Sequence, residues 1–276
     1  MKKILFFVAA FALAGFAFQS CKKDADTTDY TAEKVVAEDV TAHNDVSEQI
    51  DYDADVAIDA FMGAADDRGA CPTVTFAQPK GTWPNTITLD YSDAGCTNNA
   101  GHTVKGKIVI TQTNPMSTQG ASRSFTFENF SFDGVKVEGT KKVTNAGLNA
   151  AGQRYFTVVA SETLTYPNGT VSTHTANRTR TQIEGAATTL RADDVWSVTG
   201  SASGTNRNGV AYTVTITNPL IKKVLCPWIS QGTIEITANN KTRSIDYGDG
   251  ACDKDATLTL PDGTVKEVKI RHFWWK

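Results

Sequence analysis

Most of this 276-residue sequence lacks the apolar runs that would let it cross a bilayer. A membrane-spanning helix needs about 20 apolar residues, and no segment after Ser20 provides them. The sequence also has no Gly-x-Ser-x-Gly or His-Glu-x-x-His motif, and its 4 histidines are scattered. No catalytic motif is therefore present, although catalytic residues that converge only in space are not excluded.

Metal and nucleic-acid sites also lack their usual signals. The 5 cysteines include no Cys-x-x-Cys pair and have no clustered histidines beside them, which does not favour a zinc site. From residue 68 onward the chain carries 22 basic and 16 acidic residues, so it is only mildly basic. This weak charge, in a chain whose beginning predicts export, argues against nucleic-acid binding. No cofactor is indicated.

The first residues have the pattern of a bacterial lipoprotein signal. Lys2 and Lys3 precede an apolar run from Ile4 to Phe18, and Cys21 follows closely, so we expect residues 1–20 to be removed. The segment before Cys21 resembles a lipobox, which predicts a lipid on that cysteine; the alternative is cleavage without lipid. Lys22 follows in place of aspartate, and by resemblance to enterobacterial sorting rules this favours the outer membrane or cell surface.

Charge divides the mature chain into two parts. Residues 21–67 contain 14 acidic and 3 basic residues, a net charge of −11, whereas residues 68–276 have a net charge of +6. We expect an acidic tether and helical lead that hold a basic body away from the bilayer. Each part can simply solubilise itself; alternatively, the body attracts anionic surface polymers or the tether itself.

The acidic part contains two helical patterns. Residues 24–29 are polar and predict a disordered tether. Apolar residues then recur at helical spacing over Ala32–Val40 and, more clearly, over Ala54–Ala65. The second pattern is expected to dock on the body through Phe61 and Met62, and Gly63 is expected to help end it.

Period-two alternation dominates the rest of the chain. It is clear in Val104–Thr111, Val135–Glu138 and Val210–Thr217, where apolar residues alternate with threonine or charged residues. Such alternation predicts half-buried antiparallel strands with one wet face. We expect a mainly β fold of ten to thirteen strands, a large antiparallel meander of sandwich or half-barrel type, with a bulge near Glu128 and Asn129.

An internal repeat links the remaining cysteines. Cys-Pro, a strand and Asp-Tyr-x-Asp-x-x-Cys occur in the unit at 71–113 and again in the unit at 226–271. The Cys-to-Cys spacings of 25 and 26 agree closely, so we predict the disulfides Cys71–Cys96 and Cys226–Cys252. The alternative is a reduced, buried set of cysteines.

The order of these elements resembles that of uncharacterised bacterial envelope lipoproteins. The matching segments are Val135–Thr140, Thr199–Val210 and Asp246–Gly250, within a chain that begins with a cysteine for lipid and an acidic helical lead. The resemblance implies the architecture and the location in the cell envelope. It implies no activity and no catalytic residue, because none is assigned to that family.

Three cationic side chains share one face of a predicted strand. His174, Arg178 and Arg180 lie on the same side of Val171–Ile183, and Lys141 is near them if the middle strands are neighbours. Arginine favours bidentate recognition of carboxylate, sulfate or phosphate, so these residues are candidates for ligand binding. The alternative is a solvated face that discourages edge pairing.

Two further groups have competing interpretations. Four aspartates of the second repeat could bind calcium or could cap a tight turn: Asp246, Asp249, Asp253 and Asp255. The aromatic residues Phe273–Trp275 could stack on sugars or touch lipid headgroups, or could close the core. Trp83, Trp196 and Trp228 are predicted core residues.

These patterns favour a non-enzymatic, lipid-anchored binding or scaffolding protein, whose ligand is a glycan or another envelope protein. The membrane is a partner through the lipid alone. One alternative is a hydrolase of envelope or host polymers, which would need carboxylates or a histidine pair converging in a cleft. The other is a lipid or lipoprotein carrier, in which a curved sheet encloses an apolar groove.

Overall fold

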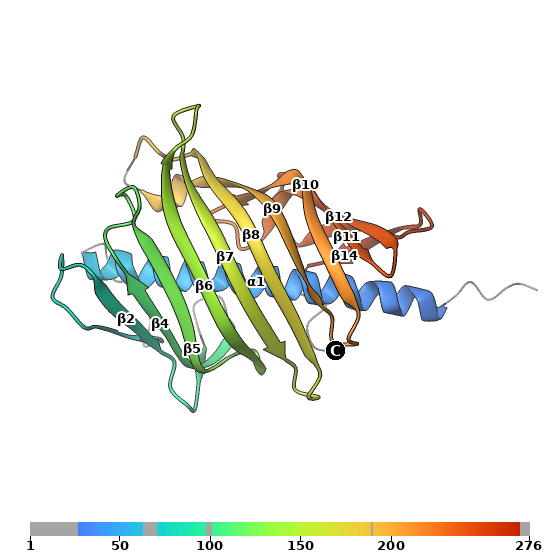
Figure 1. Ribbon diagram of the computed structural model, residues 1–276, viewed down its shortest axis with the longest axis horizontal. Helices are drawn as coiled ribbons and strands as arrows, with labels where there is room; N and C mark the ends of the chain where they lie inside the picture. Colours follow the sequence, from blue (N-terminus) through green and yellow to red (C-terminus); the bar gives the residue numbers. More distant parts are fainter. Residues whose placement is uncertain (1–26, 63–70, 98–100, 189, 271–276) are drawn as a thin grey trace, which may run out of the picture.

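The chain folds as one long helix packed against one face of a large antiparallel sheet (Figure 1). The computed structural model describes residues 27–62, 71–97, 101–188 and 190–270, with helix side chains described for 34–59. This confirms the mainly β meander with an N-terminal helix. The sheet has fourteen strands, slightly more than predicted.

The helix α1 spans Thr27–Met62, and a 3-10 turn, η1, spans Arg191–Asp193. The strands are β1 Thr73–Phe76, β2 Asn85–Asp90, β3 Cys96–Thr97, β4 Thr103–Gln112, β5 Ser122–Phe132, β6 Val135–Leu148, β7 Arg154–Thr165, β8 Val171–Glu184, β9 Val195–Thr205, β10 Ala211–Lys223, β11 Ile229–Ala238, β12 Lys241–Asp249, β13 Asp255–Thr259 and β14 Val265–Lys269. Each strand pairs with its neighbours in sequence, except that β2 pairs with β4 and the short β3 pairs with one end of β4.

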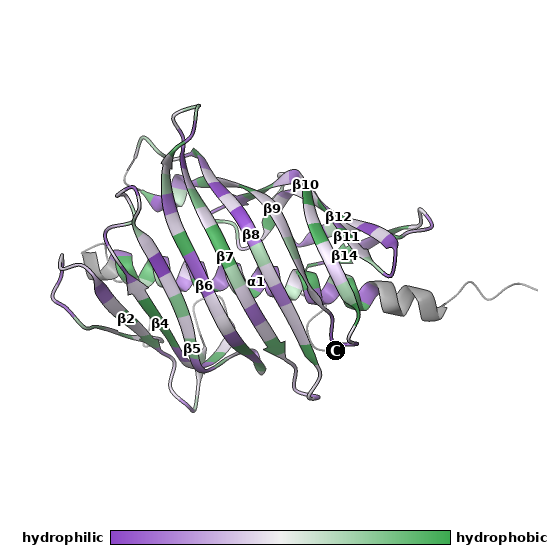
Figure 2. Cartoon of the chain, viewed as in Figure 1, coloured by the Kyte–Doolittle hydropathy of each residue, from purple (hydrophilic) through white to green (hydrophobic). Residues whose placement is uncertain are grey.

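Side-chain alternation explains why one face of the sheet takes the helix. Buried and exposed residues alternate along β4 and β7, as the period-two pattern predicts. Figure 2 shows the same alternation of hydrophobic and hydrophilic residues along the strands. The inward residues form two apolar clusters, one with the helix around Val36 and Val40 and one with the helix around Val46 and Ile50.

Bends in individual strands allow the sheet to curl around the helix. Gly139 in β6 has a φ of 119°, and a Cβ there would lie 2.0 Å from the carbonyl oxygen of Ser161. Only glycine tolerates both that φ and that close approach of a neighbouring backbone. The predicted bulge is confirmed, because the register of β5 against β6 shifts between Thr126 and Ser131, and Asn129 has a φ of 47°.

The helix corrects two predictions. The two helical patterns belong to a single helix of 36 residues, and it already begins at Thr27, within the segment expected to be a disordered tether. The helix is described as far as Met62, and Gly63, which was expected to help end it, lies outside the described residues. The side chains of Phe61 and Met62 lie outside the described residues, so their predicted docking remains a prediction.

The burial of α1 differs from that of an ordinary amphipathic helix. All eleven residues of Val36–Val46 are buried, whereas a helix on a flat surface buries about half of its circumference. The sheet therefore surrounds this part of the helix, and polar residues such as Asp39 and His43 are buried with the apolar ones. No described helix combines the length and the apolar character needed to span a membrane.

The disulfide prediction is confirmed by geometry. Cys71 lies 5.9 Å from Cys96, and Cys226 lies 5.7 Å from Cys252, measured between Cα atoms, with each pair of sulfurs joined. The first pair encloses the β1–β2 hairpin and the second encloses the β11–β12 hairpin, so each repeat is a hairpin closed by its own disulfide.

Candidate functional site

A row of carboxylates on α1 forms one wall of the candidate site. Glu48, Asp51, Asp55 and Asp59 are spaced by three, four and four residues, so they lie along one side of the helix. We call this row the acidic stripe. Its charges face cations from three strands and one loop, which are far from the helix in sequence.

Ion pairs join the acidic stripe to cationic side chains of the sheet and of η1. The Asp51 carboxylate lies 2.8 Å from Lys141 Nζ and 3.5 Å from Arg180 Nη1. Asp55 lies 2.7 Å from Arg123 Nη1 and 2.8 Å from Arg191 Nη1. Arg191 also pairs with Asp59 through its Nε. The arrangement fixes the C-terminal half of α1 on β5, β6, β8 and η1.

These pairs decide the ionisation of the stripe. Burial disfavours the charged form of Asp55, but Arg191 and Arg123 outweigh it and lower the pKa of Asp55 to about 2. Burial raises the pKa of Asp51, and Lys141 and Arg180 offset only part of that effect. Burial likewise raises the pKa of Asp59 despite Arg191.

Two cavities adjoin the acidic stripe. The first has a volume of about 380 Å³ and lies between the helix and the loops β1–β2, β4–β5 and β8–β9; we call it the loop-end cavity. The second, of about 390 Å³, is lined by Tyr52, Val56, Val224 and Leu225 among others, and we call it the apolar cavity. Both volumes are typical of sites for small ligands.

Aromatic and cationic side chains meet in the loop-end cavity. Phe156 and Trp196 pack edge to face with ring centroids 5.6 Å apart, and Arg180 lies over the Trp196 ring at 4.4 Å. Trp196 is buried, as predicted, but Trp83 is half-buried and lines the cavity, so its prediction as a core residue is wrong. Trp228 is half-buried against the first apolar cluster.

Several polar groups of this cavity have no described partner. The side chain of Arg154, at the start of β7, lines the cavity and makes no hydrogen bond or ion pair within the described part of the chain. Gln182 donates its Nε2 to Asp194 Oδ1 at 2.6 Å, but its own Oε1 is buried and accepts no hydrogen bond there. The Nε of Arg180 is buried without an acceptor as well. A buried polar group without a partner costs about 1–3 kcal/mol, so the buried atoms of Gln182 and Arg180 favour a polar occupant.

The predicted ligand-binding residues lie on the inward face of β8, not on a solvated one. His174 is 2% exposed and lies 2.8 Å from the Tyr212 hydroxyl through its Nδ1. Arg178 donates to Asn44 Oδ1 of the helix, and Arg180 binds Asp51. The solvated-face interpretation is wrong, because α1 covers this face. Lys141 is indeed near, since it shares Asp51 with Arg180.

The middle of the helix–sheet interface contains a polar cluster that sequence patterns did not reveal. The rings of His43 and His174 stack with centroids 4.9 Å apart, and His43 Nδ1 lies 3.8 Å from Glu162 Oε2. These residues, with Asn44 and Arg178, line a cavity of about 10 Å³, the space of about one water molecule. Each contributes a buried atom without a described partner: His43 Nδ1, Asn44 Nδ2, Glu162 Oε1, His174 Nε2 and Arg178 Nε.

This cluster is too enclosed for catalysis on a polymer. Its two donors, Asn44 and Arg178, and its two acceptors, Glu162 and His174, match the four hydrogen bonds of one water. Burial, together with His43 and Arg178, lowers the pKa of His174 well below its usual range, so His174 is neutral. A histidine pair exists, but not in an open cleft.

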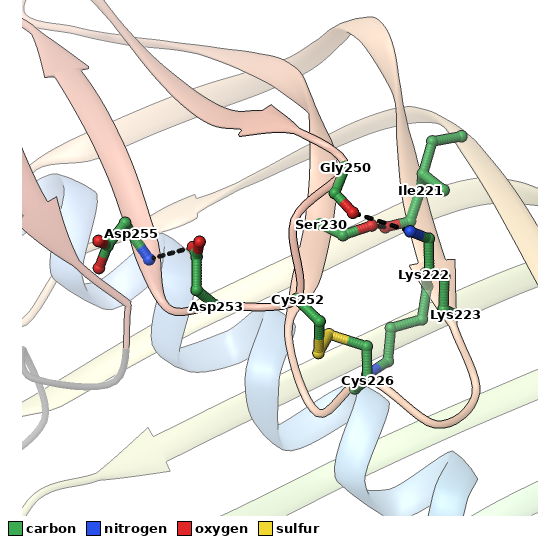
Figure 3. Close-up of a disulfide and its surroundings, with 9 residues drawn as sticks. All are labelled: Ile221, Lys222, Lys223, Cys226, Ser230, Gly250, Cys252, Asp253 and Asp255. Atoms are coloured by element: carbon green, nitrogen blue, oxygen red, sulfur yellow. Dashed lines mark hydrogen bonds between the residues drawn. A yellow bond between two sulfur atoms is a disulfide. The ribbon is translucent and has the colours of Figure 1, made fainter.

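The aspartates of the second repeat serve the turn. Asp246 Oδ1 accepts the Gly248 amide at 2.8 Å. Asp253 Oδ1 accepts the Asp255 amide at 2.9 Å, as Figure 3 shows. Asp255 also pairs with Lys269. The contacts of Asp246 and Asp253 cap turns, which is the alternative to calcium binding that the sequence left open. Within the described ranges, no three His, Cys, Asp or Glu side chains are arranged to hold a metal ion.

Some predicted residues lie outside the described part of the chain. Cys21 and the aromatic segment Phe273–Trp275 are among them, so lipidation and the role of the aromatic end stay predictions. The residues that the sequence analysis missed are Arg154, Arg191, Gln182 and the acidic stripe. Only the stripe has a sequence signal, the helical spacing of its carboxylates.

Comparison of the chain with known protein families, with characterised proteins and with solved structures finds no match.

Proposed function

We propose that the protein is a lipid-anchored protein of the outer membrane or cell surface that binds a saccharide in the loop-end cavity. The observation that carries this proposal is the composition of that cavity, where the half-buried Trp83 lies with unpaired hydrogen-bonding groups of Arg154, Arg180 and Gln182. Sugar rings have an apolar face that stacks on tryptophan and hydroxyls that both donate and accept hydrogen bonds.

The helix supports this proposal by its position between the anchor and the cavity. Five residues separate Cys21 from Thr27, and they extend at most about 20 Å. From Thr27 to Asp55 the helix then rises about 40 Å. A lipid on Cys21 would therefore lie near the start of α1, and the loop-end cavity, which Asp55 lines, would lie toward the other end of the helix. From Thr27 onward the helix acts as a rigid spacer within the body, although the sequence predicted a disordered tether as far as residue 29.

A glycan array tests the proposal. Full-length protein purified in detergent would be applied to printed oligosaccharides, together with the variant Trp83→Ala. Tyr155→Ala is the matched control, because Tyr155 is a half-buried aromatic residue on β7 that does not line the cavity. We expect wild type and Tyr155→Ala to retain the same glycans and Trp83→Ala to bind them about tenfold more weakly. Retention of no glycan by wild type would refute the proposal.

A hydrolase is a second candidate, favoured by carboxylates in the same cavity. Burial raises the pKa of Asp194, whereas Arg191 and Arg123 overcome burial to lower that of Asp55 to about 2. Two carboxyl groups whose surroundings shift their pKa values in opposite directions are what acid–base hydrolysis of a glycoside requires. Release of new reducing ends by wild type but not by Asp194→Asn would support this function. Intact glycans after prolonged incubation with wild type would refute the hydrolase function.

The carrier hypothesis has less support. It places an apolar groove on the inner face of the curved sheet, and α1 occupies that face where both are described. The apolar cavity beside Tyr52 and Leu225 is the space that remains for an acyl chain.

A further inference from the structure

The charges of the loop-end cavity specify the class of saccharide. Four arginines and four aspartates line it. Three of the arginines are engaged by these aspartates, since Arg123 and Arg191 bind Asp55 and Arg180 binds Asp51. Of the remaining two aspartates, Asp59 binds Arg191, and Asp194 accepts the Gln182 amide. The fourth arginine, Arg154, has no described partner. An unpaired guanidinium in a cavity favours an anionic group of the ligand over a hydroxyl.

The position of Arg154 supports a role in binding. It is the first residue of β7, its backbone pairs with Leu148, and its side chain is half-buried at the cavity wall. Two residues further along the same face of β7, Phe156 packs against Trp196 and closes the apolar side of the cavity. Arg154 is therefore held on a rigid strand and not on a mobile loop tip.

Gln182 provides an independent observation that points to a ligand. Its side chain lines the same cavity and is 6% exposed, and its Oε1 is a buried acceptor without a donor among the described residues. Its amide nitrogen is committed to Asp194, so the orientation of the amide is fixed with Oε1 free to accept. The buried Nε of Arg180 supplies a donor at the same wall. A ligand hydroxyl can satisfy either group.

The planar shape of the Arg154 guanidinium indicates which class of anion it binds. Arginine presents two parallel N–H donors in a plane, which matches the two oxygens of a carboxylate. A free inorganic anion would leave most of the roughly 380 Å³ and the aromatic wall unused. A ring that carries a carboxylate uses both the cation and the apolar wall.

We propose that the loop-end cavity binds a carboxylate-bearing saccharide, with Arg154 holding the carboxylate, Gln182 and Arg180 bonding hydroxyls, and Trp83 stacking on the ring. This inference rests on the proposed saccharide-binding function and names its ligand class. It makes Arg154 the residue that separates acidic from neutral saccharides.

The test uses pairs of oligosaccharides that differ only by a carboxylate, such as a uronate-terminated oligosaccharide and its counterpart reduced to the primary alcohol. Affinities would be measured by calorimetry with the full-length protein in detergent, using the best pair from the array. We expect the uronate to bind about ten- to a hundredfold more tightly than the alcohol. Arg154→Gln should abolish this preference, because it should weaken binding of the uronate far more than binding of the alcohol.

Two further variants sharpen the test. Arg154→Lys keeps the charge without the planar fork, so it should retain only part of the preference. Lys142→Gln makes the same charge change at an exposed residue of β6 that does not line the cavity, and it should bind as wild type does. Melting temperatures close to wild type show that each variant is folded.

The outcomes separate the two proposals. Equal affinity for uronate and alcohol, or a preference unaffected by Arg154→Gln, would overturn the acidic-saccharide inference and leave saccharide binding intact. A preference for sulfated glycans over uronates would overturn the assignment of a carboxylate. Binding of acidic peptides and of no saccharide would overturn both proposals, as would a wild-type protein that retains nothing.

Discussion

The replacement Asp39→Asn tests whether buried charge holds the helix in the sheet. Asp39 is 0% exposed, and its carboxylate accepts the Tyr166 hydroxyl at 2.7 Å, the Arg207 amide at 2.6 Å and Arg207 Nε at 2.6 Å. Asparagine has nearly the same shape as aspartate. The change therefore removes the charge, opposes an amide donor to the guanidinium, and leaves the packing almost untouched.

The expected magnitude follows from the surroundings of Arg207. Loss of one partner from a buried ion pair costs about 3–5 kcal/mol, because the other charge stays buried without compensation. The Arg207 side chain is 18% exposed, and Glu38 Oε2 lies 3.4 Å from Arg207 Nη2 as a second partner. Both facts reduce the loss, so we expect about 3 kcal/mol, the lower end of that range.

Urea unfolding of the full-length protein, followed by tryptophan fluorescence, measures this loss. At a slope of about 3 kcal/mol per molar urea, the midpoint should fall by about 1 M. Glu184→Gln removes an exposed carboxylate that has no described partner, and its effect should stay within about 0.5 kcal/mol. The double variant Asp39→Asn/Arg207→Gln should recover most of the loss, because it leaves no unpaired charge. Two outcomes would show that buried charge does not hold this part of the helix. One is a loss of stability in Asp39→Asn as small as that in Glu184→Gln. The other is a loss in the double variant equal to the sum of the losses in Asp39→Asn and Arg207→Gln measured separately.

Three further predictions concern other parts of the chain. Burial lowers the pKa of His174 below the 6.5 of an unfolded histidine, so the unfolded state binds the extra proton as the pH falls. The free energy of unfolding should therefore fall by about 1.4 kcal/mol per pH unit below pH 6.5. Thermal unfolding across pH 5–8 would measure this slope, which should flatten in His174→Phe. Replacement of both Cys226 and Cys252 by serine opens a loop with a sequence separation of 26 and should cost about 3 kcal/mol in urea unfolding. Cys21→Ser should abolish incorporation of labelled palmitate and move the protein from the membrane fraction to the soluble one; retention in the membrane would contradict lipidation.

The sheet could be predicted from the sequence because its signal is local. Alternation in Val104–Thr111 and Val210–Thr217 specifies which face of each strand is buried. The spacing of the repeated cysteines likewise predicted both disulfides. A meander pairs neighbours in sequence, so local signals also determine most of its topology.

The burial of the helix and the site could not be predicted in the same way. Asp39 has the sequence pattern of a surface residue in any local window, and its partner Arg207 lies 168 residues further along the chain. The loop-end cavity combines Trp83, Arg154 and Gln182, which come from three separate segments. Helical periodicity failed over Val36–Val46 because it assumes that a helix has one dry face, whereas here the curled sheet supplies partners on every side.

The buried charges suggest a reason for this unusual interface, which we state as a hypothesis. Valine and alanine recur along α1, so apolar packing alone would distinguish poorly between positions of the helix one turn, or about 5.4 Å, apart. The pairs Asp39–Arg207, Asp51–Lys141 and Asp55–Arg123 tie the helix to the sheet at three points, and the first and last are 16 residues apart. A slip of one turn would break all three and bury unpaired charges, at a cost well above the gain from any new apolar contact. The ion pairs would then specify the register of the helix more than they add to stability, and that register decides whether Asp55 and Asp59 reach the loop-end cavity at all.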